Sequence, residues 1–114
     1  GSTFGGNPVS AASANVVLDT VMKPEFLKEV EEKGAYIKEK VLGFHSPAVK
    51  NVRGMGLMLG IIVDPEKRAG YVAKLMEKGV LVLTAGTDAI RLLPPLVITY
   101  EEIDKALEAM KEVF

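Results

Sequence analysis

Strand-like segments in this sequence come in adjacent pairs, and single helix-like segments separate the pairs. The first pair lies within AVKNVRGMGLMLGIIVD (48–64), where Gly54 and Gly56 join or bend two strands. The second pair is VLVLTAG (80–86) and AIRLLP (89–94), with a turn between them. Glycine inside a strand pattern marks a bulge or a close backbone approach. Because there is no long alternation of strand and helix, we expect an α+β fold, a small antiparallel sheet of about four strands with helices packed on one face.

The first two helix-like segments differ in character. Asn7 and Pro8 suit a helix N-terminus, and the segment that follows is rich in alanine, serine and valine, which predicts close packing against a neighbour. In the second segment (24–42), apolar positions advance by 3 and 4, as in an amphipathic helix. Gly34 lies in its middle, where glycine costs about 1 kcal/mol relative to alanine. That cost predicts that another backbone passes close to Gly34.

Two further helices are marked by their end signals. Asp64-Pro65 starts one helix and Gly79 ends it. The last helix begins at a capping box, in which Thr99 and Glu102 have the S/T-x-x-E spacing.

Composition excludes several classes of function. The 114 residues are 48% apolar and 25% charged, which is typical of a globular domain, and the net charge is −1. No basic stripe is available for a nucleic acid backbone. No apolar run approaches the roughly 20 residues of a membrane span, and no signal peptide is recognisable. The absence of cysteine removes disulfides and thiolate chemistry and fits a cytoplasmic location.

Metal and nucleophilic sites have little support in the sequence. The single histidine, His45, lies at a helix end, where a partly charged imidazole suits the helix dipole. A metal site or a Ser-His-Asp triad needs more partners than one histidine in this position can recruit. Arg53 and the glycines after it fit a strand bend better than a dinucleotide-binding loop, because their spacing is one residue too long. We therefore assign no metal ligand and no catalytic residue.

The N-terminal loop GSTFGGNP has the ingredients of an anion site. Ser2 and Thr3 supply hydroxyls, Gly5 and Gly6 free backbone N–H groups, and the helix beginning at Pro8 adds the positive end of its dipole. Two simpler interpretations stay open: a glycine-rich loop can merely cap a helix, and the first two residues can be a cloning remnant.

Arg91 is a permanent cation within the apolar run AIRLLPPLVIT (89–99). One interpretation is an edge-strand arginine whose stem packs while its head reaches water or a neighbouring carboxylate. The other is a pocket in which a ligand supplies the anion, since a planar guanidinium suits a carboxylate or phosphate oxygen pair. The rigid Pro94-Pro95 step would hold the strand end in place.

Four motifs in order, GSTFGGNP, VRGMGLMLGI, GVLVLTAG and IRLLPPLVIT, resemble the C-terminal part of class-III, fold-type I aminotransferases, which use pyridoxal 5′-phosphate. The likeness covers the whole chain and is strongest to the acetylornithine group. By this resemblance, Thr3, with Ser2 beside it, would contact the cofactor phosphate of a neighbouring subunit, and Arg91 would take the substrate α-carboxylate. Residues 1–22 would form a loop and helix that pack on a missing large domain, and residues 23–114 would form the small domain.

The resemblance implies an enzyme that moves an amino group from N-acetylornithine to 2-oxoglutarate in arginine biosynthesis, as a cytoplasmic homodimer. The lysine that binds the cofactor covalently lies upstream of the loop in this family, so the chain alone should lack the cofactor and be inactive. Three alternatives stay open: an ornithine-type or 4-aminobutyrate-type aminotransferase, an amino-acid-binding module without catalysis, and a purely structural interaction domain.

Overall fold

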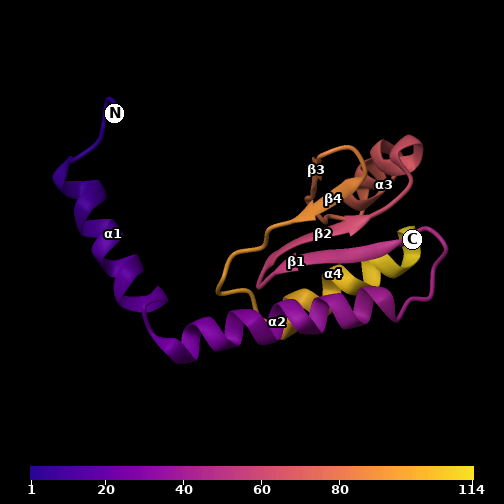
Figure 1. The fold of residues 1–114 in the computed structure, drawn as a ribbon, viewed down its shortest axis with the longest axis horizontal. Helices are drawn as coiled ribbons and strands as arrows, with labels where there is room; N and C mark the ends of the chain where they lie inside the picture. The colour runs from indigo at the N-terminus through magenta and orange to yellow at the C-terminus, as the bar shows by residue number, and fades with distance from the viewer.

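The computed structural model describes all residues from Gly1 to Phe114. Its elements in chain order are α1 (Pro8–Val21), α2 (Pro24–Leu42), β1 (Asn51–Met55), β2 (Met58–Ile62), α3 (Pro65–Glu77), β3 (Leu83–Ala85), β4 (Ala89–Leu92) and α4 (Tyr100–Val113). The strands form one antiparallel sheet in the order β1-β2-β4-β3 (Figure 1). The predicted α+β fold and the order of its elements are therefore confirmed.

One face of the sheet carries the core. Leu59 of β2 lies opposite Leu92 of β4, and Ile61 lies opposite both Val52 and Ile90. The helices α2, α3 and α4 pack against these side chains. The buried residues that they contribute are Ile37, Val41, Leu75, Ile103, Leu107, Met110 and Val113. The helices thus cover a single face, and the opposite face of the sheet carries no helix of this chain.

Gly34 allows α2 to lie directly on the β1–β2 hairpin. A Cβ atom placed on Gly34 would come within 2.0 Å of the carbonyl oxygen of Gly56, which is closer than real Cβ atoms approach any atom. Gly56 itself has a positive φ of 51° in the hairpin turn. The close backbone approach predicted from the sequence is therefore present.

Strand β3 is shorter than the segment 80–86 that the sequence predicts. The amide of Val80 donates to the carbonyl of Leu75 at 2.9 Å, and Gly79 adopts a φ of 79°, which together close the end of α3. Because this amide completes a helix terminus, it cannot join the sheet ladder. β4 also ends two residues earlier than predicted, at Leu92, before the first of the two prolines.

Helix α1 projects away from the rest of the chain, with the N-terminus at its far end (Figure 1). None of its residues is buried, although several are large and apolar. The exposed apolar side chains of this segment are Val9, Val16, Val17, Leu18 and Met22. No helix of the structure combines the length and the apolar character needed to cross a membrane.

Polar contacts at the helix ends follow the sequence signals. The Asn7 side chain accepts from the Ser10 amide at 2.9 Å and caps α1. The capping box of α4 is complete: Thr99 Oγ1 accepts from the Glu102 amide, and Glu102 Oε2 accepts from the Thr99 amide at 2.8 Å. Between α2 and α4, the Tyr36 hydroxyl donates to Asp104 at 2.7 Å, and this hydrogen bond raises the pKa of Tyr36.

The capping box predicts a pH dependence of stability. Hydrogen bonds from the backbone and then from the side chain of Thr99 lower the pKa of Glu102 below its ordinary value of 4.5. A lowered pKa in the folded state means that the ionised carboxylate stabilises the fold above pH 4.5 and that this contribution is lost as the pH falls through the folded-state pKa. We therefore expect Glu102→Gln to lower the free energy of unfolding at neutral pH and to have a smaller effect in acid, as measured by urea unfolding.

Glu108→Gln on the exposed side of α4 is the matched control, because the Glu108 carboxylate forms no hydrogen bond or ion pair. Its effect should be small at both pH values. An effect of Glu102→Gln that stayed constant from neutral to acid pH would contradict a role for the charge.

Candidate functional site

The uncovered face of the sheet holds the strongest candidate for a site. Across the three strands β1, β2 and β4, Arg53 lies opposite Gly60, and Gly60 lies opposite Arg91. These three residues form a row across the sheet, called here the arginine row. Leu83 on β3 extends it beside Arg91. Residues directly opposite one another in adjacent antiparallel strands share a face, so both arginines stand on the side away from the core.

Arg91 is an exposed residue on an interior strand, since β4 lies between β2 and β3. The interpretation of Arg91 as an edge-strand arginine is therefore wrong, because β4 is not an edge strand. The guanidinium forms no ion pair and no hydrogen bond within the chain. Because its neighbours in the row are Gly60 and Leu83, no carboxylate stands beside it on the sheet.

The other two arginines, Arg53 and Arg68, both have partners within the chain. Arg53 Nη2 lies 3.6 Å from Asp88 Oδ1. Arg68 Nη1, on α3, donates to the carbonyls of Ala85 and Gly86 at 3.3 and 2.7 Å. Arg91 is thus the one arginine of the chain with neither an ion pair nor a hydrogen bond, and a planar guanidinium in this state suits a carboxylate.

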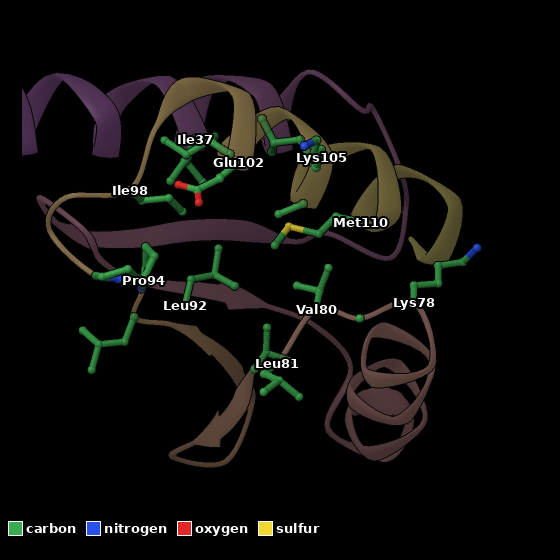
Figure 2. A pocket seen from close by; sticks show the side chains of 17 residues that line it. Ile37, Lys78, Val80, Leu81, Leu92, Pro94, Ile98, Glu102, Lys105 and Met110 are labelled. Atoms are coloured by element: carbon green, nitrogen blue, oxygen red, sulfur yellow. The ribbon is translucent and has the colours of Figure 1, made fainter.

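Arg91 lines neither of two cavities of this chain, whereas the sequence suggested a pocket around it. A cavity of about 450 Å³ lies on the helix side of the sheet and has a mainly apolar lining. Figure 2 shows Leu92, Pro94 and Val80 on one side of it and Met110 of α4 on the other. Arg91 does not line this cavity.

The N-terminal loop lies at one end of the long axis of the chain, far from the strands β1 and β4 that carry Arg53 and Arg91 (Figure 1). Ser2 and Thr3 are exposed, and their hydroxyls form no hydrogen bond within the chain. Gly6 has a φ of 82°, which glycine adopts without strain, and it leads the loop into the capped start of α1. The structure therefore does not bring Ser2 and Thr3 together with Arg91 in a single chain.

No histidine or acidic cluster competes with this face as a site. His45 is exposed, in the loop after α2, with a positive φ of 50°. No group of three or more His, Cys, Asp or Glu side chains is arranged to hold a metal ion.

Sequence reasoning missed the part played by Arg53, Arg68 and Asp88. Arg53 was expected only to mark a strand bend, and the turn before β4 was expected only to connect two strands. Both arginines instead contact that turn, one through the Asp88 carboxylate and one through backbone carbonyls. The only available signal was an aspartate in the turn next to a strand with an arginine, which is too common to interpret without the register.

Comparison with known proteins gives consistent results over the whole chain. Residues 1–114 match the family described as aminotransferase class-III. The acetylornithine aminotransferase of Bacillus cereus is 48% identical over 115 residues, which cover 99% of this chain and 30% of that protein. The ornithine aminotransferase of Staphylococcus carnosus is 40% identical, and the match covers all of this chain and 28% of that protein.

Solved structures agree with these relatives. The N-acetylornithine aminotransferase from Stenotrophomonas maltophilia K279a superposes with a TM-score of 0.87 at 29% identity, over 96% of this chain and 31% of that one. The ornithine aminotransferase from Toxoplasma gondii ME49 superposes with a TM-score of 0.86 at 32% identity, over 99% of this chain and 28% of that one. The chain thus spans less than a third of each of these proteins.

Proposed function

We propose that this chain, which belongs to the class-III aminotransferase family, forms the C-terminal small domain of a pyridoxal 5′-phosphate enzyme and supplies its carboxylate clamp, Arg91. The observation that carries the proposal is the free guanidinium of Arg91 on the uncovered face of the sheet. Since the chain spans only about 30% of its relatives, the remaining parts of the site would come from the rest of the enzyme.

The residues present fit the cofactor phosphate as a partial contact. The Ser2 and Thr3 hydroxyls are exposed and have no partner within the chain, so they are free to donate to phosphate oxygens. Helix α1, with no buried residue and an exposed apolar surface, supports the division into residues 1–22, which pack on a large domain, and residues 23–114. Because the loop lies far from Arg91, it would serve the site of a neighbouring subunit in a homodimer. When bound, pyridoxal phosphate supplies the electron sink of the reaction.

Arg91 would orient the substrate. A bidentate guanidinium–carboxylate pair fixes both the position and the rotation of the carboxylate, and it thereby aligns the neighbouring carbon with the cofactor. In 2-oxoglutarate the reacting carbon adjoins a carboxylate. In N-acetylornithine the free amino group is at the other end of the molecule from the carboxylate. Arg91 is therefore expected to serve the half-reaction of 2-oxoglutarate and glutamate.

The proposed donor is N-acetylornithine, and the pathway is arginine biosynthesis. This choice is supported by the acetylornithine aminotransferases among the relatives, at up to 48% identity. Ornithine is the second candidate, because ornithine aminotransferases match nearly as well in sequence and structure.

We infer that no lysine of this chain binds the cofactor covalently. Its lysines lie on helices or beside helix and strand ends, and none stands on the uncovered face beside Arg91. Lys33 is the one buried lysine, and it pairs with Glu29 at 2.8 Å. We therefore expect residues 1–114 alone to be inactive.

The test is the amino-donor profile of the full-length enzyme that contains this segment. With 2-oxoglutarate as acceptor, kcat/KM should be highest for N-acetylornithine, lower for ornithine and lowest for 4-aminobutyrate. A preference for ornithine would favour the second candidate. Binding of amino acids without any transamination would instead support a binding module, and the enzyme proposal would fail.

A further inference from the structure

The row Arg53–Gly60–Arg91 places two arginines at equivalent positions of alternate strands. Neighbouring strands lie about 4.8 Å apart, so the two backbones are separated by about 9.6 Å. A side chain at the middle position would fill the space between the arginines, and Gly60 has none. Both guanidinium groups could therefore serve one ligand that spans this gap.

The stem of Arg53 already leans over the glycine. A Cβ atom placed on Gly60 would lie 3.8 Å from Arg53 Cγ and 3.6 Å from the Ala89 Cβ. The side chain is 63% exposed, so its head is not fixed by packing. The one ion pair of its guanidinium is with Asp88.

The Asp88 carboxylate is delivered by a well-anchored turn. The Asp88 carbonyl accepts from the Val63 amide at 2.9 Å, which ties the turn to the end of β2. On the other side of the turn, Arg68 holds the carbonyls of Ala85 and Gly86. Asp88 Oδ1 then lies 3.6 Å from Arg53 Nη2, and its side chain is 36% exposed. The turn thus places one negative charge beside Arg53 and none beside Arg91.

We propose that Asp88 is a specificity-determining residue, because it neutralises Arg53 and leaves Arg91 as the only free guanidinium of the row. With Asp88 in place, the face receives a single carboxylate at Arg91. Without it, Arg53 and Arg91 together would hold a dicarboxylate across Gly60, in a position that competes with correct substrate alignment. This inference rests on the proposed role of Arg91 as a carboxylate clamp.

The experiment compares two five-carbon inhibitors of the full-length enzyme, glutarate with two carboxylates and pentanoate with one. Asp88→Asn keeps the shape of the side chain and removes its charge. It should lower the inhibition constant of glutarate, measured in competition with 2-oxoglutarate, by about fivefold. This factor corresponds to the free energy of one partly exposed ion pair, formed between Arg53 and the second carboxylate. The inhibition constant of pentanoate should not change. The double variant Asp88→Asn with Arg53→Gln should return glutarate to its wild-type value.

Arg53→Gln alone keeps the proposal testable if Asp88→Asn fails to fold. Since Asp88 already neutralises Arg53, glutarate and pentanoate should inhibit this variant with the same inhibition constants as the wild type. A weakening of glutarate alone would overturn the proposal, as would an Asp88→Asn enzyme with no gain for glutarate. Arg91→Ala distinguishes a failure of the proposed function from a failure of the inference about Asp88. If this variant leaves both inhibition constants unchanged, Arg91 is not a carboxylate clamp, whatever the effect of Asp88→Asn.

Discussion

Replacing Arg91 with alanine in the full-length enzyme is expected to lower kcat/KM for 2-oxoglutarate by about a thousandfold. Truncating one partner of a desolvated charge pair costs about 4 kcal/mol, which corresponds to that factor. Arg91→Lys should recover only part of the loss, because an ammonium cannot grip both carboxylate oxygens in one plane. The measurement is steady-state kinetics on variants whose thermal unfolding matches the wild type.

Cofactor binding should be nearly unaffected by the same substitution. Arg91 lies on the sheet face, whereas the residues proposed to meet the phosphate lie in the distant N-terminal loop. The dissociation constant of pyridoxal phosphate, measured by spectroscopic titration of the apoenzyme, should therefore change little. Loss of cofactor binding with retained affinity for 2-oxoglutarate would show that the assigned role is wrong.

Gly34→Ala is expected to destabilise the fold by about 3 kcal/mol, an effect at the upper end for overpacking. The new Cβ would lie 2.0 Å from the carbonyl oxygen and 2.6 Å from the carbonyl carbon of Gly56. These are backbone atoms, so no side-chain rotation can relieve the clash, and α2 must move away from the hairpin. Urea unfolding monitored by circular dichroism would measure the loss.

Gly70→Ala is the matched control, because Gly70 also lies inside a helix, α3, and a Cβ there meets no atom within 4 Å. Alanine should stabilise this helix by up to about 1 kcal/mol through its higher helix propensity. If the two substitutions changed the free energy of unfolding equally, the close contact between α2 and the hairpin would not be the reason for glycine at position 34.

Local signals in the sequence predicted most of the fold. Asn7, Thr99 and Glu102 are helix caps whose partners lie within a few residues, so their spacing is sufficient. Gly34 could be interpreted because glycine is costly in a helix, although its partner, Gly56, could not be identified. The start of β3 was mispredicted because the Val80 amide is taken by α3, and that competition depends on the geometry of the helix end.

The sequence predicted less of the candidate site than of the fold. Arg91 stood out because it interrupts an apolar run, but its surroundings depend on which strands are neighbours. The pairing of β2 with β4 puts Gly60 between Arg91 and Arg53, and Arg91 is far from the other two in the sequence. The other parts of the proposed site would belong to the rest of the enzyme, so the sequence of this chain carries no signal for them.

The central claim, that Arg91 binds the carboxylate next to the reacting carbon, is tested most directly with two amino donors that differ only in that group. 4-Aminobutyrate is L-glutamate without its α-carboxylate. In single-turnover reactions of the full-length enzyme, the wild type should prefer glutamate strongly, and Arg91→Ala should lose that preference by reacting more slowly with glutamate and almost unchanged with 4-aminobutyrate. An equal slowing with both donors would contradict the claim.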